Sequence, residues 1–171
     1  MTRALTIQKW MTYTVVGLLP LWLLDAYILS RYPVFGLTPQ LLPLAVVCVS
    51  ILEGAYAGTG FGMGVGLLWT LTYPGNVNLR ILLLALVGMA IGALAQYALR
   101  QSFVGYLLCS FVLLAGLNGL TVLQERMLQH GAFAALVEVA IGDTVLTLLW
   151  SPLVYWLFHK IFRKVGGNRL A

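Results

Sequence analysis

Hydrophobic residues run along the chain in six long stretches, separated by charged residues or by turn-forming residues. A helix needs roughly 20 apolar residues to cross about 30 Å of hydrocarbon, with a usual range of about 17–25. The pattern therefore predicts six membrane-spanning helices. The first is predicted to be a retained span and not a secretion signal, because it is long and contains Asp25. The predicted spans are Met11–Ser30, Gln40–Tyr56, Gly58–Tyr73, Ile81–Leu99, Phe103–Leu123 and Leu136–His159.

The connections between these spans are short. Almost nothing separates the second span from the third, where Glu53 is followed by Gly54 and Gly58, and this favours a tight hairpin over one long kinked helix. The longest stretch outside the spans, Gln124–Ala135, is predicted to be an amphipathic elbow on the outer surface. Without a linker or a tandem repeat, residues 1–171 are predicted to form a single integral membrane domain.

Composition supports the same class of protein. Hydrophobic residues make up 61% of the chain and charged residues 9%, whereas soluble domains average about 45–50% and about 25%. So little charge does not cover a soluble surface, and the hydrophobicity is too high for a disordered chain. Two cysteines do not make a secreted disulfide scaffold. We therefore expect an all-α, polytopic membrane protein.

Charged residues sit almost entirely at the edges of the apolar stretches. Ten Lys and Arg against five Asp and Glu leave a formal net charge of +5, but this placement indicates membrane-facing loops and no nucleic-acid partner. Cytoplasmic loops carry the excess of basic residues. With six spans, one side would carry both termini and Arg3, Lys9, Arg100, Lys160, Arg163, Lys164 and Arg169, while the other would carry Arg31, Arg80 and Arg126. Both termini are therefore predicted to be cytoplasmic.

Glycine is the densest signal in the predicted spans. Glycines recur at a spacing of four, which places them on one helix face and lets two membrane helices approach closely. This predicts helix packing, while a ligand cavity or the docking of a partner's helix stays an alternative reading. The glycines of this stripe are Gly54, Gly58, Gly62, Gly66, Gly88 and Gly92. Gly60 and Gly64 form a second row beside it.

Four acidic residues lie in the predicted spans or at their edges. A carboxylate facing lipid costs a few kcal/mol, so each is expected to face protein, water or an interface. Glu53 and Glu138 lie near the boundaries, where contact with water is expected. Asp25 and Asp143 lie deeper, in the outer third, and the sequence places no basic residue at their depth. Each is expected to be hydrated, protonated or paired with a cation of a partner protein.

The sequence shows no constellation for catalysis. Cys48 and Cys109 fall in the middle of spans, where thiols behave as small apolar residues. His130 and His159 lie on opposite sides of the predicted membrane, and no serine sits in a nucleophile elbow. The protein is therefore expected not to be an enzyme, and to hold no cofactor and no metal.

Two segments carry a resemblance to a known family. The first is Gly62–Leu71, which reads GMGVGLLWTL and is followed by the turn Pro74-Gly75. The second is Leu149–Leu153, which reads LWSPL and is followed by Tyr155 and the basic segment Lys160–Lys164. Together with the size, the six predicted spans and the short loops, they resemble the rod shape-determining protein family MreD. The family usually has Asp where this chain has Thr70, so no role of that acid is carried over.

The resemblance implies a non-enzymatic membrane subunit of the bacterial elongation machinery, the elongasome. Such a subunit works in the cytoplasmic membrane with the single-span protein MreC and, indirectly, with MreB filaments. RodA and a class B penicillin-binding protein are further implied partners. Its task would be to organise lateral peptidoglycan synthesis and so maintain cell shape.

The same resemblance leaves a second function open. MreD is similar in fold to the substrate-binding S components of energy-coupling-factor vitamin transporters, so a six-helix bundle of that kind is expected for either function. Short, Gly-interrupted apolar segments such as Gln40–Tyr73 mark transport sites in some transporters. A transporter subunit needs a pocket with several convergent polar groups, whereas an organiser needs packed helices and a docking face.

Overall fold

The structure is a computed structural model, and all of its regular elements in the described part of the chain are helices. It describes residues 10–29, 31, 37, 39–72, 77–97, 102–127 and 133–164. The elements are η1 (Tyr13–Leu18), α2 (Leu19–Leu23), η2 (Leu24–Leu29), α3 (Leu41–Glu53), α4 (Ala55–Thr72), α5 (Val77–Tyr97), α6 (Phe103–Met127) and α7 (Phe133–Lys164). The predicted all-α class is therefore confirmed.

The first three elements form one continuous helix, Trp10–Leu29, which we call the N-terminal helix. Its middle turn, α2, is α-helical and contains Pro20, and the turns on either side of it are π-helical. Proline has no N–H to donate to the hydrogen-bond ladder. Irregular turns of this kind are common where a membrane helix accommodates a proline.

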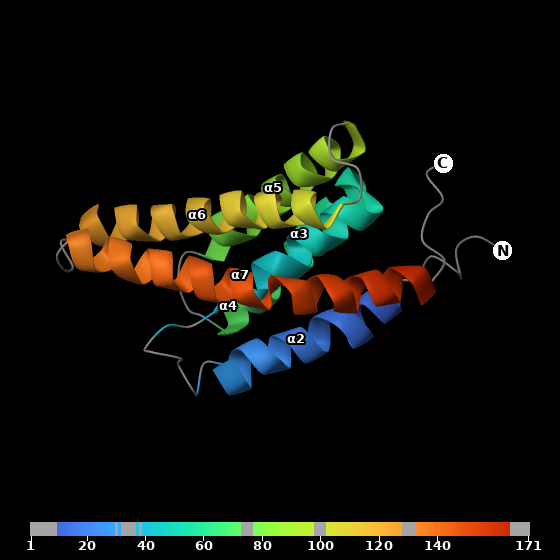
Figure 1. The fold of residues 1–171 in the computed structure, drawn as a ribbon, viewed down its shortest axis with the longest axis horizontal. Coiled ribbons are helices and arrows are strands. Elements are labelled where there is room, and N and C mark those ends of the chain that lie inside the picture. Colours follow the sequence, from blue (N-terminus) through green and yellow to red (C-terminus); the bar gives the residue numbers. More distant parts are fainter. Residues whose placement is uncertain are drawn as a thin grey trace.

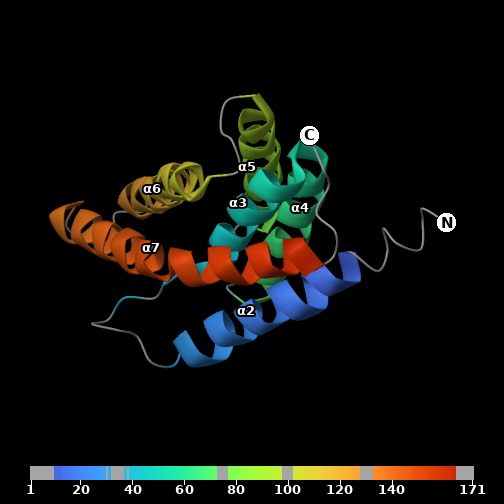
Figure 2. The ribbon, with the colours of Figure 1, turned by 45° about the vertical axis from the view of Figure 1, so that its right-hand side comes forward.

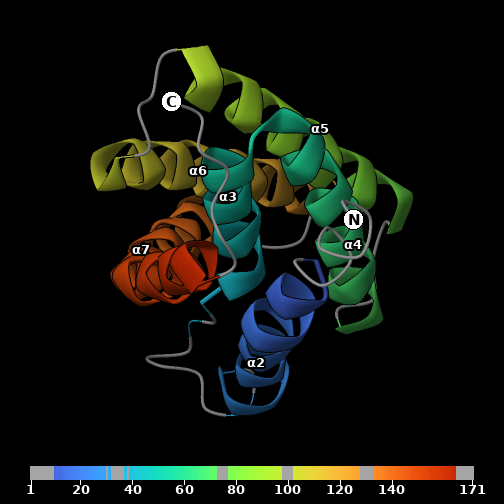
Figure 3. The same ribbon diagram turned by 90° about the vertical axis from the view of Figure 1, so that its right-hand side faces the viewer.

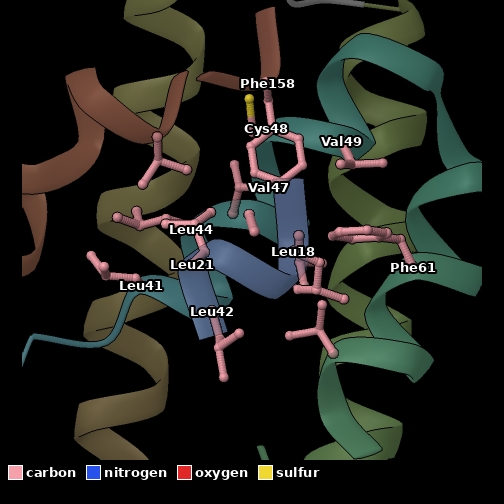
Figure 4. Packing of buried hydrophobic residues seen from close by; sticks show 14 of the residues in the cluster. Leu18, Leu21, Leu41, Leu42, Leu44, Val47, Cys48, Val49, Phe61 and Phe158 are labelled. Carbon is pink, nitrogen blue, oxygen red and sulfur yellow. The ribbon is translucent and has the colours of Figure 1, made fainter. Parts of the chain in front are cut away.

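Helix α3 is the centre of the molecule. All of its side chains from Leu41 to Leu52 are buried. A helix that is apolar all round suits either a protein interior or lipid, and here the other helices of the chain cover its faces. Figure 3 shows α3 with α4 and α5 on one side, α6 and α7 on the other, and the N-terminal helix below. The core around it includes Leu18, Leu21, Phe61 and Phe158 from three other segments (Figure 4).

The other helices form two pairs around this centre. Helices α4 and α5 pack against each other over most of their length, and α6 and α7 run side by side as a long antiparallel pair (Figure 1). Helices α5 and α6 follow each other in the chain but diverge in space, with little contact between them (Figure 2). This divergence leaves the flank of α6 that faces α5 open.

Among the described residues, three helices are long and apolar enough to cross a membrane. They are Trp10–Leu29, Phe103–Gln124 and Leu136–Lys164. A helical segment lies at each of the six predicted spans, but the apolar helices Leu41–Glu53 and Ile81–Gln96 are shorter and α4 is not among the three, so the six-span arrangement stays a prediction. The 13 residues of α3 extend about 20 Å, less than the hydrocarbon thickness of about 30 Å. The chain is thus an all-helical protein with the features of a membrane protein.

Two predicted boundaries differ in the structure. Helix α3 ends at Glu53 and α4 begins at Ala55, so Gly54 alone makes the turn, with φ +91° and ψ −175°, a backbone conformation open mainly to glycine. The predicted elbow over Gln124–Ala135 is wrong at both ends, because α6 continues to Met127 and α7 starts at Phe133. The remaining residues, 128–132, lie outside the described residues.

Candidate functional site

The glycine stripe lies between α4 and α5 of this chain. A Cβ built on Gly62 would lie 2.5 Å from the backbone oxygen of Leu84, and one on Gly66 would lie 2.8 Å from Cα of Ile81. A Cβ on Gly58 would meet the backbone oxygen of Gly88 at 2.6 Å. These separations leave no space for a side chain, so the backbones of the two helices are in direct contact.

The other members of the stripe face the same pair of helices. A Cβ on Gly92 would lie 2.5 Å from Cα of Ala55, at the start of α4. A Cβ on Gly54 would meet the side chain of Gln96 at the end of α5. Atoms of the same chain therefore lie against all six glycines, and the stripe is not an open face for another protein.

The second glycine row is different. A Cβ on Gly60 or Gly64 would have no atom within 4 Å. Both glycines line an open groove between α4 and the N-terminal helix, together with Trp10, Thr14 and Tyr56. Of two neighbouring glycine rows on α4, one therefore contacts the backbone of α5 and the other faces an open groove. The four-residue spacing alone does not distinguish the two rows.

Asp25 lies inside the fold, with 2% of its surface exposed. One of its carboxyl oxygens accepts a hydrogen bond from the backbone N–H of Leu41 at 3.4 Å. This N–H belongs to the first turn of α3, where helix donors have no partner within the helix. Asp25 therefore provides an acceptor for one backbone N–H at the start of the central helix, and its surroundings are those of a structural residue.

A polar cluster at the same end of the bundle was not predicted. The Asn118 amide on α6 donates to Oγ1 of Thr144 at 2.8 Å and to the backbone oxygen of Ala140 at 3.2 Å, both on α7. Gln40, which precedes α3, donates from Nε2 to Oδ1 of Asn118 at 3.4 Å and from its backbone to Oγ1 of Thr147 at 3.0 Å. An asparagine in an apolar stretch is the signal that points to such a cluster.

Two of the other acids have defined positions. Glu53 accepts a hydrogen bond from the Tyr13 hydroxyl at 2.9 Å, which joins the end of α3 to the N-terminal helix. Asp143 is half-buried on α7, and its backbone oxygen accepts a hydrogen bond from Thr147 at 2.6 Å. The three states predicted for the Asp143 carboxyl, which are hydrated, protonated or paired with a partner's cation, stay a prediction.

An apolar groove separates α5 from α6, and we call it the α5–α6 groove. Its volume is about 530 Å³. The α5 wall includes Leu83, Val87 and Ala90, and the α6 wall includes Val112 and Gly116. A Cβ on Gly116 would have no atom within 4 Å, so the backbone of α6 is accessible from this groove.

A second apolar groove follows the opposite side of α6, where it faces α7. We call it the α6–α7 groove; its volume is also about 530 Å³. Phe111, Gly119 and Val122 line it from α6, and Ile141 lines it from α7. Among the described residues that line the two grooves of α6, Arg126 is the one with a basic side chain.

The remaining candidate residues have ordinary surroundings. The Thr70 hydroxyl, where the resembling family has Asp, donates to the backbone oxygen of Leu67 in its own helix at 2.8 Å. Cys48 is buried and Cys109 half-buried, both as free thiols. Within the described residues, no group of three or more His, Cys, Asp or Glu is arranged to hold a metal ion.

The arrangement is therefore one of closed interior contacts and open apolar flanks. The polar atoms around Asn118 mostly bond to one another, and the side chains that face the grooves of α6 are almost all apolar. Comparisons of the chain with protein-family models, with curated proteins and with solved structures find no match.

Proposed function

We propose that this protein is a non-enzymatic membrane subunit of a bacterial elongation complex, with the role that its resemblance to MreD implies. It binds a single-span, MreC-like protein and helps to organise lateral peptidoglycan synthesis. The observation that carries the proposal is the α5–α6 groove, which has the properties of a helix-docking surface.

The chemistry of this groove supports a transmembrane helix as the occupant. Membrane helices associate by close packing at small residues, since burial of apolar surface provides no driving force between them in lipid. Gly116 and Ala90 supply small residues on its two walls, and the described residues that line it include no charged side chain. The groove also lies along the middle of the apolar span of α6, so a partner helix that crosses the membrane beside α6 would pass through it.

The proposed topology has six spans in the cytoplasmic membrane, with both termini in the cytoplasm. It rests on the seven-to-three distribution of basic residues and on the six helical segments. In this arrangement MreB filaments are reached indirectly, through the MreC-like partner, and RodA and a class B penicillin-binding protein belong to the same complex.

The groove chemistry weighs against the vitamin-transporter alternative. A small-molecule site places several polar groups toward one cavity. The described residues that line the α5–α6 groove carry apolar side chains or the Cys109 thiol, and in the α6–α7 groove the Asn118 amide is engaged by Thr144 and Ala140. Binding of a vitamin at nanomolar affinity, together with pairing to an ATPase-coupled transmembrane subunit, would replace the elongation proposal by this alternative.

The experiment is co-purification of the tagged chain from a rod-shaped bacterium. We expect a single-span MreC-like protein to be recovered with the wild-type chain, and depletion of the chain to give rounded cells that still build septa. Gly116→Leu places a side chain into the α5–α6 groove and is expected to lower recovery of the partner at least fivefold.

Gly60→Leu is the matched control, because it also adds a side chain to an open groove but on α4. It should leave recovery of the partner unchanged. Equal recovery with Gly116→Leu and Gly60→Leu would show that the α5–α6 groove is not the docking surface. Rod-shaped growth without the chain would contradict the elongation role itself.

A further inference from the structure

The α6–α7 groove differs from the α5–α6 groove in having a charge at one end. Its walls are apolar from Phe111 to Leu123 along α6, and Val137 and Val145 add to them from α7. Asn118 lies in its floor with 6% of its surface exposed, and its amide is bonded to α7. The groove therefore offers hydrocarbon contacts along its length and a guanidinium at its end.

The length of the groove matches one leaflet of a bilayer. From Phe111 to Leu123 the groove extends about 18 Å along α6, at 1.5 Å per residue. Half of a hydrocarbon core of about 30 Å is about 15 Å. Toward the other end of the pair, Phe103 and Tyr106 of α6 contact Tyr155 of α7, with ring centroids 5.2 Å apart in each case, and these rings do not line the groove.

Arg126 is at the level where lipid headgroups lie. The apolar span of α6 is Phe103–Gln124, and Arg126 follows it by two residues on the last turn of the helix. Its side chain is exposed and lines the groove. Glu138 of α7 is exposed near the same end but does not line the groove. Among the described residues that line the groove, Arg126 is the charged one, and it lies at the mouth.

We propose that the α6–α7 groove binds an anionic glycerophospholipid of that leaflet. One acyl chain lies along the groove, and the phosphate of the headgroup pairs with Arg126. This ligand has the two features that the groove requires, a chain of one-leaflet length and a negative charge at its end. A partner helix crosses both leaflets, whereas the groove lies toward one end of α6, where its lining on that helix runs from Phe111 to Arg126.

The test compares phosphatidylglycerol with phosphatidylcholine of identical acyl chains. Each lipid is titrated onto the purified full chain in detergent, and bound lipid is measured by native mass spectrometry. One basic side chain near a lipid surface contributes about 1 kcal/mol, so we expect phosphatidylglycerol to bind about fivefold more tightly. Arg126→Gln should abolish this preference, and Arg126→Lys should largely keep it.

Arg31→Gln is the matched control, since it removes one exposed arginine that lines neither groove of α6. It should keep the fivefold preference. Gly119→Phe fills the groove at a position where a Cβ meets no atom within 4 Å, and should weaken binding of both lipids. Ala115→Leu is a milder filling variant, for use if Gly119→Phe lowers the melting temperature.

Two results would overturn the proposal. One is an unchanged preference for phosphatidylglycerol in Arg126→Gln, which would place the anion elsewhere, for example at the basic end of α7. The other is unchanged lipid binding in both groove-filling variants, which would show that lipid binds outside the groove. Neither result bears on the MreC-like partner, because the α5–α6 groove is a separate surface.

Discussion

Single residues at the ends of α3 show how the buried helix is held in place. Asp25 accepts a hydrogen bond from Leu41 at the start of α3, and Glu53 accepts one from Tyr13 at its end. Both bonds join α3 to the N-terminal helix. Polar groups that are out of water stabilise a fold when they are paired, and they cost free energy when one partner is lost.

Substitution of Asp25 is therefore expected to change stability of the isolated chain. Asp25→Leu removes the acceptor for the Leu41 N–H and should lower the free energy of unfolding by about 1–3 kcal/mol. Asp25→Asn keeps an oxygen acceptor and should cost less. The measurement is unfolding of the purified chain in detergent, without any partner. Equal stability of Asp25→Leu and the wild type would contradict this structural role.

The hydroxyl of Tyr13 provides a second test at this scale. Tyr13→Phe removes the donor to Glu53 but keeps the ring that stacks on Phe158, with centroids 6.2 Å apart. We expect a loss of about 1–2 kcal/mol in the free energy of unfolding. Tyr27→Phe is the control, because Tyr27 is 66% exposed. A loss of the same size in both variants would show that the hydrogen bond from Tyr13 to Glu53 does not stabilise the fold.

Helix pairs are the next scale, and the contact of α4 with α5 is the clearest example. On α4, Gly62 meets the backbone of α5 and Gly64, two residues later, meets no atom. Successive residues of an α-helix point about 100° apart, so two glycines two positions apart face different surroundings. Either glycine would permit a close helix contact, and the position of α5 decides that Gly62 is the one at which a side chain cannot fit.

These two glycines give a matched pair of substitutions. Gly62→Ala places a methyl group 2.5 Å from the backbone oxygen of Leu84, so the helices must separate, and we expect a loss of about 1–3 kcal/mol. Gly64→Ala adds the same methyl group in open space and should be neutral or slightly stabilising. Thermal unfolding of both variants in detergent measures the difference. Equal melting temperatures would show that α4 and α5 are not in backbone contact.

The whole molecule combines a closed interior with open flanks. Helix α3 is covered on all sides, while α6 has an apolar groove on each flank. Such flanks are stable in lipid, because lipid tails are as apolar as the side chains that line them. A partner helix or a lipid with the right shape replaces bulk lipid there by making closer contacts.

The orientation of the molecule is testable with reporter fusions. Alkaline phosphatase fused after Arg169 is expected to be inactive, because seven basic residues retain that side in the cytoplasm. The same enzyme inserted after Met127, at the end of α6 and within the predicted connection Gln124–Gly131, is expected to be active. The reverse pattern would invert the proposed topology, and activity at both positions would change the number of spans.

Much of the fold was accessible from local patterns. The apolar stretches placed a helical segment at each predicted span, and Gly54 marked the turn between α3 and α4. The elbow over Gln124–Ala135 was not placed correctly, because polar residues at a helix end do not show whether the helix continues into the headgroup region. The partner of Tyr13 and the cluster around Asn118 were also missed, since both join residues far apart in the chain.

The sequence by itself determined that this is an all-helical protein suited to an apolar environment. It also showed at which glycines helices can pack closely, and which acidic residues lie within apolar stretches. These are properties of composition and local spacing. Only the tertiary structure decided that the glycine stripe packs between α4 and α5 and that Asp25 accepts a hydrogen bond from the start of α3. It also decided that α6 has an open groove on each of two flanks. The reason is that a small or polar residue fits several neighbours equally well, and the packing of the whole chain selects one of them.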